Sequence, residues 1–225
     1  MIEFPESAAF GKKIALVQLK KKGLKARLLE MVKSLTWAYK LAPSTINLAA
    51  TESVKEVEVL DLTLRGEGDK TRNFALIIEQ LAKMIPNPCI CRLFSEEGGE
   101  LGVAVCPKAS GGALYGDSPA FRLCVGRDAV PSTSSAGGGT PALPIGVTTL
   151  ESYLIHFAAN LSGIEIAAEE LLRDFIARHY KLESLKSDLA DLEKKIAKEI
   201  HFDKKYELTK QRQRLQKEIQ LTAGG

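Results

Sequence analysis

The chain has 225 residues, of which 45% are hydrophobic and 26% are charged. These proportions are those of an ordinary globular protein and exclude a disordered, collagen-like or disulfide-scaffold composition. The formal net charge of +3 is too small to indicate nucleic-acid binding by itself. The chain starts with an acidic segment rather than a secretion signal, and no stretch is apolar over the roughly 18 residues that a membrane span needs. We therefore expect a cytoplasmic protein without a membrane partner.

The first predicted element is an amphipathic helix. Apolar residues recur at spacings of three and four over residues 24–35, which is typical of a helix with one apolar side. Pro43 disfavours helical geometry at the residue before it, so we expect this helix to end near Lys40. Residues 54–64 are rich in Val and Leu and predict a strand. A change of alternation halfway along this strand indicates a bulge or burial on both faces.

The middle of the chain predicts a second helix and three more strands. Apolar residues at helical spacing predict a helix over residues 74–85. Two short apolar runs, residues 89–94 and 101–106, predict an antiparallel hairpin, and residues 120–125 predict a further strand. The expected fold is α+β, in which a small mixed sheet backed by helices forms a domain over residues 1–127.

A helical region is expected after the sheet. Residues 128–149 are rich in Gly, Pro, Ser and Thr and predict a flexible connection, and residues 150–225 predict helices at 150–161 and from Ile164 onward. Apolar residues at the alternating spacing of a coiled coil predict a seam for oligomerisation, formed by Leu182, Leu185, Leu189, Leu192 and Ile196. This register fails near His201, which leaves two alternatives, one long helix with a stutter or a helical hairpin.

Four segments carry a resemblance to a known family. They are residues 36–48, which contain Trp37, Tyr39, Lys40, Pro43 and Asn47, and residues 54–59, 85–88 and 202–205. In this order they resemble an uncharacterised prokaryotic family catalogued as domain of unknown function 4391. The family has no assigned chemistry, so the resemblance implies a fold but no catalytic residues. It implies a role beside DNA-processing machinery, because members are often encoded near helicases and DNA methyltransferases of restriction-like phage-defence systems.

We interpret the first of these segments as a structural corner. Trp37 and Leu41 are expected to pack beneath the sheet, and the side chain of Asn47 is expected to hydrogen-bond the local backbone. The turn-forming residues after Lys40 support this interpretation.

Four cysteines, Cys89, Cys91, Cys106 and Cys124, could converge on neighbouring strands as a four-thiolate zinc site. Their spacing is not that of the paired cysteines of zinc knuckles, and buried cysteine also packs as a small hydrophobe. The favoured interpretation is a structural core, so we assign no metal and no cofactor. Disulfides are disfavoured because the cytoplasm is reducing.

Catalytic motifs are weak in this sequence. The three histidines, His156, His179 and His201, do not have the spacing of a helix-borne zinc pair, and phosphate-binding glycine loops and nucleophile elbows are missing from the sequence. A metal-dependent nuclease needs two acids and a lysine near a strand end. The nearest candidates are Glu58, Asp61, Asp69 and Lys70, and they do not form such a set on one strand face.

Positive charge is concentrated near the N-terminus. The tentative nucleic-acid-binding residues are Lys12, Lys13, Lys20, Lys21, Lys22, Lys25 and Arg27, with Lys33 and Lys40 in the same stretch. Trp37 and Tyr39 lie beside them, and basic residues interleaved with aromatic ones can bind phosphates and stack on bases. The favoured alternative is a solvated lysine face and a tryptophan in the core.

The expected function is a non-catalytic interaction or assembly subunit that forms a homodimer or binds a partner protein through its C-terminal helices. The first alternative is an accessory protein that binds nucleic acid weakly through the basic N-terminal region. A metal-dependent nuclease is the least favoured hypothesis.

Overall fold

A computed structural model describes residues 4–66, 70–107 and 147–224. The chain divides into two compact units, Met1–Ser162 and Gly163–Gly225. The elements of the first unit are η1 (Glu6–Ala8), β1 (Ala9–Lys13), α1 (Leu16–Lys21), α2 (Ala26–Met31), β2 (Val32–Leu41), β3 (Val57–Leu64), α3 (Lys70–Met84), β4 (Cys89–Phe94), β5 (Glu100–Cys106) and α4 (Leu150–Ser162). The second unit contains α5 (Leu172–Lys198) and α6 (Phe202–Ala223). Within the described ranges, no helix is long and apolar enough to cross a membrane.

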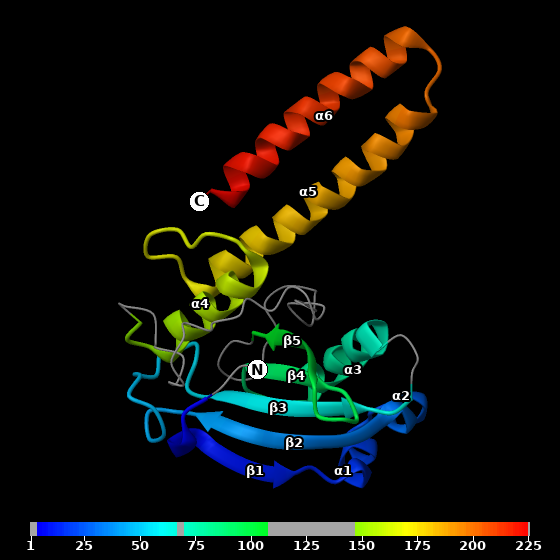
Figure 1. Ribbon diagram of the computed structural model, residues 1–225. Coiled ribbons are helices and arrows are strands. Elements are labelled where there is room, and N and C mark those ends of the chain that lie inside the picture. The colour runs from blue at the N-terminus through cyan, green and yellow to red at the C-terminus, as the bar shows by residue number, and fades with distance from the viewer. Residues whose placement is uncertain (1–3, 67–69, 108–146, 225) are drawn as a thin grey trace. The chain divides into compact units, whose positions relative to one another are not determined.

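The first unit is built on a five-stranded mixed sheet with the order β1-β2-β3-β4-β5 (Figure 1). All neighbouring strands are antiparallel except β3 and β4, which are parallel. A parallel pair needs a crossover connection, and α3 supplies it. The fold is therefore α+β, as the sequence predicts. The predicted strand at residues 120–125, with Cys124, and most of the predicted connection at 128–149 lie outside the described residues.

The predicted helix up to Lys40 is wrong beyond Met31, because β2 follows α2 directly. Leu28 of α2 and Leu35 of β2 are both buried in the same hydrophobic core. The spacing of three and four thus reflects a shared core and not one continuous helix. Strand β1 was not expected, since all five of its residues are exposed and no apolar alternation marks it.

The change of alternation in β3 reflects burial on both faces of that strand. Trp37 of β2 pairs with Leu60, whereas Tyr39 pairs with Val59, so Ala38 is the extra residue of a bulge. The bulge therefore lies in β2. Strand β3 pairs with β4 without any register shift, and its first four residues are all buried.

Helices α3 and α4 and the β4–β5 hairpin form where the sequence predicts them. The main core lies between α3 and one face of the sheet and includes Phe74 and Leu60. Backbone hydrogen bonds from Ala49 to Thr148 and from Leu150 to Ala49 join α4 to the loop after β2. α4 thus belongs to the sheet unit.

The second unit is a helical hairpin. α5 and α6 run antiparallel and lie side by side (Figure 1), and Lys181 of α5 forms an ion pair with Glu218 of α6 at 3.0 Å. This resolves the two alternatives for the tail in favour of a hairpin, with residues 199–201 as the link. The helix that was expected from Ile164 begins at Leu172.

Candidate functional site

A row of paired residues crosses four strands of the sheet. Lys40 of β2 pairs with Glu58 of β3, Glu58 pairs with Cys89 of β4, and Cys89 pairs with Cys106 of β5. Directly paired residues place their side chains on the same face of a sheet. The sheet therefore brings an ammonium group, a carboxyl group and two thiols into one line.

Three of the four segments that resemble the family meet at the Lys40 end of this row. The Asn87 amide donates hydrogen bonds to Glu56 Oε1 at 2.5 Å and to Glu58 Oε1 at 3.1 Å. Lys40 Nζ lies 2.5 Å from Glu56 Oε2. We call Lys40, Glu56, Glu58 and Asn87 the polar cluster. It was not expected from the sequence, because strand register and the loop before β4 bring its members together.

Glu58 is the buried member of the polar cluster, with 7% of its surface exposed. Burial raises the pKa of its carboxyl group to about 6, although the hydrogen bond from Asn87 acts in the opposite direction. Glu58 therefore exchanges a proton under mildly acidic conditions, which is a property of carboxyl groups that act in acid–base chemistry.

The nuclease candidates do not converge. Glu58 and Asp61 are three residues apart on β3, so their side chains point to opposite faces of the sheet. Asp61 is engaged by Arg92, whose Nε and Nη2 donate to its two oxygens at 2.7 and 2.8 Å. Asp69 lies outside the described residues, and Lys70 is the first residue of α3. The two acids that the structure describes thus cannot share one metal ion.

Arg92 is a buried structural residue of the opposite face, with 4% of its surface exposed. The rings of Phe4, Tyr39 and Phe94 surround its guanidinium group, with centroids 5.6, 5.3 and 5.2 Å away. Cation–π contacts and the bidentate ion pair compensate for burial of the charge. Tyr39 of the family-like segment therefore packs against Arg92 and Phe4 and is half-buried.

The corner at residues 36–48 is closed by Thr45. Its hydroxyl accepts a hydrogen bond from the backbone N–H of Ala42 at 2.9 Å and donates to the carbonyl of Lys40 at 2.7 Å. Asn47 is exposed, and within the described part of the chain its side chain forms no hydrogen bond, so this detail of the expected corner is wrong. Pro43 is also exposed.

Trp37 is half-buried on β2 and packs against the main core. Its indole N–H donates to the carbonyl of Tyr39 at 3.0 Å, and the ring of Phe10 lies 4.6 Å from its own ring, centroid to centroid. Leu41 is fully buried. The apolar part of the predicted corner is thus present, but it lies within the sheet.

The basic N-terminal residues lie on β1, α1, α2 and the links between these elements (Figure 1). All seven are exposed: Lys12, Lys13, Lys20, Lys21, Lys22, Lys25 and Arg27. We call them the basic surface. Ion pairs in the described ranges engage Lys33 with Glu96 and Lys40 with Glu56, but none engages these seven. Phe10, 47% exposed, lies beside Lys12 on the same strand. This arrangement can bind phosphates, although lysines on an edge strand also prevent sheet-to-sheet aggregation.

Three cysteines meet in the core. The sulfur atoms of Cys89, Cys91 and Cys106 all lie within 4.8 Å of one another, and the three residues are fully buried and reduced. We call them the thiol cluster. In the part of the chain that the structure describes, it is the one group of His, Cys, Asp or Glu side chains close enough to hold a metal ion. The histidines do not join it, since they lie on α4, on α5 and in the hairpin link.

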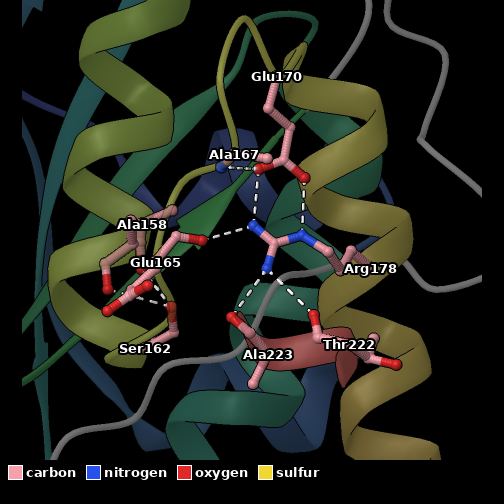
Figure 2. Close-up of polar contacts among 9 residues, drawn as sticks. Ala158, Ser162, Glu165, Ala167, Glu170, Arg178, Thr222 and Ala223 are labelled. Carbon is pink, nitrogen blue, oxygen red and sulfur yellow. Dashed lines mark hydrogen bonds and ion pairs between the residues drawn. The ribbon is translucent and has the colours of Figure 1, made fainter. Parts of the chain in front are cut away.

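Arg178 fastens the base of the hairpin (Figure 2). Its guanidinium group forms a bidentate ion pair with Glu170, with hydrogen bonds of 2.8 and 2.6 Å. It also donates to the carbonyls of Thr222 and Ala223 at the C-terminal end of α6, and to that of Glu165. The last carbonyls of a helix need such donors, and a cation there also offsets the helix dipole. Sequence reasoning missed this residue, because its partners are 8 to 45 positions away.

The predicted seam faces α6 and is covered unevenly. Leu182 and Leu185 are buried, whereas Leu189, Leu192 and Ile196 are only half-buried. α6 is 22 residues long and has no buried residue. The seam is thus buried near the base of the hairpin and partly open along the rest of its length.

The link of the hairpin and the first residue of α6 carry the most exposed apolar side chains of the second unit. Ile200 is 91% exposed and Phe202 is 81% exposed. Two large apolar residues in solvent at one place are typical of an interaction surface.

Comparison with known proteins gives a single family. The family model described as Domain of unknown function (DUF4391) matches residues 2–111, a range that includes all five strands. No curated protein and no solved structure matches the chain. The match confirms the resemblance to this family and covers three of its four segments, whereas the fourth, residues 202–205, lies in the hairpin beyond the matched range.

Proposed function

We propose that this chain, which belongs through its N-terminal half to the family of domain of unknown function 4391, is a non-catalytic assembly subunit that self-associates through its hairpin. The observation that carries the proposal is the exposure of α6, which has no buried residue. An isolated helix is marginally stable in water, so most helices depend on burial of an apolar face. A second helical surface would supply that burial.

The surface beside the seam fits a second copy of the chain. A groove of about 440 Å³ runs between α5 and α6, with Leu192 and Leu215 in its lining. Acidic and basic side chains line it together, among them Asp188, Lys195 and Arg214. A two-fold axis places each patch against its counterpart, so a surface with both signs can pair with itself. Two hairpins would then form a four-helix bundle.

Sedimentation of the full chain at tens of micromolar tests this proposal. We expect a dimer for the wild-type chain and a monomer for Leu192→Glu, because a carboxylate would be buried in the joint core. Ala190→Glu is the matched control, since Ala190 is exposed on the same helix and the variant should remain dimeric. Circular dichroism should show that Leu192→Glu keeps its helices. A monomeric wild type would contradict the proposal.

The family resemblance suggests where such a subunit acts. Its implied neighbours are helicases and DNA methyltransferases of restriction-like defence systems, so the proposed role is that of an accessory subunit beside DNA-processing machinery. Co-purification from the native cell with such enzymes, lost in the Leu192→Glu variant, would support this role. Recovery of the chain without them would contradict it.

The basic surface supports a second candidate function, weak binding of nucleic acid. Seven exposed cations without ion pairs in the described ranges can neutralise phosphates, and each contact adds about 0.9 to the slope of log affinity against log salt. We expect micromolar or weaker, salt-sensitive binding. Changing Lys20, Lys21 and Lys22 to Glu should abolish it.

A matched control is available on the hairpin. Lys204 and Lys205 are also exposed, and changing both to Glu should leave binding nearly unchanged. Fluorescence anisotropy with single-stranded and duplex DNA at several salt concentrations measures both variants. Binding that is insensitive to salt, or equal losses in the two variants, would contradict this function.

A further inference from the structure

We propose that Cys89, Cys91 and Cys106 bind one thiophilic metal ion of the zinc(II) class in the core of the sheet unit. The proposal rests on the positions of the three sulfur atoms and on the strands that hold them. It is independent of the self-association through the hairpin.

The distances between the thiols suit a metal. Zinc binds thiolate sulfur at about 2.3 Å, so two sulfurs of a tetrahedral site are about 3.8 Å apart. The sulfur atoms of Cys89 and Cys91 are 3.8 Å apart. Cys106 completes a set in which all separations are at most 4.8 Å. Side-chain shifts of about 1 Å bring the third sulfur to the same spacing.

The sheet positions the three ligands without the usual cysteine motif. Cys89 and Cys91 are two residues apart on β4, so both side chains point to the same face. Cys106 of β5 is the direct partner of Cys89 and therefore lies on that face too. Ligands on paired strands are held more rigidly than ligands on loops.

Binding of a metal ion requires the three thiols to lose their protons. Hydrogen bonding with Cys106 and Cys89, together with burial, raises the pKa of Cys91, so this thiol is protonated when no metal is bound. Binding exchanges protons for the ion: one Zn²⁺ and three thiols give a zinc tris-thiolate with a charge of −1 and three released protons. Because the cluster is fully buried, the ion has to bind as the chain folds.

The competing explanation is simple packing, and a Cys91→Val variant separates the two. Valine is close to cysteine in size and is apolar, so a core that only needs volume should tolerate it. A metal site would lose one of its three ligands. The two explanations therefore predict different metal contents for a variant that folds.

The test refolds the full reduced chain with one equivalent of zinc or cobalt(II). We expect one metal per chain by elemental analysis, a thiolate-to-cobalt charge-transfer band, and a Tm that rises with zinc. Cys91→Val should fold but bind at least about tenfold more weakly. Fewer than about one metal per ten wild-type chains after refolding, or unchanged metal content in Cys91→Val, would overturn the proposal.

Discussion

Strand β3 and helix α6 have opposite environments. β3 lies in the middle of the sheet, and Val57, Leu60 and Leu62 on it are completely buried. α6 is almost three times as long as β3 in residues, yet none of its side chains is buried. The sheet unit therefore derives its stability from its own core. In the hairpin the buried apolar residues, such as Phe175 and Leu182, all lie on α5, so α6 depends on ion pairs, on the hydrogen bonds at its C-terminal end and, in our proposal, on a second copy of the chain.

The largest expected difference between the two regions comes from one substitution made in each. Phe74→Ala should destabilise the protein by about 3–5 kcal/mol, because Phe74 is fully buried between α3 and the sheet. Phe202→Ala, its matched control, should change stability by less than about 0.5 kcal/mol, because that ring lies in solvent. Urea unfolding measures both variants, with the fluorescence of Trp37 reporting on the sheet unit and circular dichroism reporting on the helices of both units. Equal effects would contradict the comparison.

Removing the arginine of a buried ion pair should destabilise the protein much more than removing that of an exposed ion pair. Arg92→Ala should cost about 3 kcal/mol, since it leaves the carboxylate of Asp61 without its partner and empties a site between three rings. Arg173 pairs with Asp174 at 3.3 Å in solvent, so Arg173→Ala should cost about 0.5 kcal/mol or less. Chemical unfolding compares the two variants. A small effect of Arg92→Ala would show that the aromatic surroundings do not depend on the guanidinium group.

The hairpin has one buried pair of its own, Arg178 with Glu170. Burial raises the pKa of Glu170, but the hydrogen bonds from Arg178 and from the backbone N–H of Ala167, together with the charge of Arg178, outweigh it and lower the pKa below the usual 4.5. This pair therefore stabilises the hairpin above pH 4.5, and the contribution is lost as the pH falls through the lowered pKa. Arg178→Ala should destabilise the hairpin by about 2 kcal/mol and release the end of α6.

Hydrogen exchange of residues 218–223 measures the release of α6 in the Arg178→Ala variant. Faster exchange confined to this end is the expected result, because Thr222 and Ala223 lose their hydrogen-bond donor. Unchanged exchange would mean that Arg178 does not hold the end of the helix.

Glu58 should show the opposite pH dependence. Its pKa is about 6 in the folded chain against 4.5 when unperturbed, so ionisation at neutral pH costs about 2 kcal/mol of stability. Below pH 4.5 the carboxyl group is protonated in both states and the cost is absent; it appears as the pH rises through 6. Glu58→Gln should thus stabilise the sheet unit by up to about 2 kcal/mol at pH 7 and have little effect at pH 4. The free energy of unfolding of the wild type and of Glu58→Gln, measured between pH 4 and pH 7, checks this prediction. A stability difference that does not change with pH would contradict it.

The periodicity of apolar residues was enough to predict helices and strands that are separated from their neighbours by turns. The helix that includes Phe74 and the hairpin of β4 and β5 follow from their apolar spacing and glycine-bearing turn. Periodicity failed at the junction of α2 and β2, where a helix and a strand are adjacent in sequence and bury Leu28 and Leu35 in the same core. It also could not predict β1, whose residues are all exposed.

The candidate sites depended on contacts that sequence spacing does not encode. The polar cluster needs the register between β2 and β3, and the thiol cluster needs Cys106 opposite Cys89. Leucines at heptad spacing were enough to predict the long helix α5, and the role of these leucines as a seam for oligomerisation stays a prediction. The pairing of α5 with α6 could not be predicted, since the apolar residues of α6 are sparse. The hairpin forms because the chain turns at residues 199–201.

The most direct test of self-association is hydrogen exchange of the full chain at two protein concentrations far apart. If a second copy covers the hairpin, amides of α6 should exchange more slowly at the higher concentration, while amides of β3 should exchange at the same rate at both. Concentration-independent exchange throughout α6 would contradict the account, because the hairpin would then be stable without a partner copy.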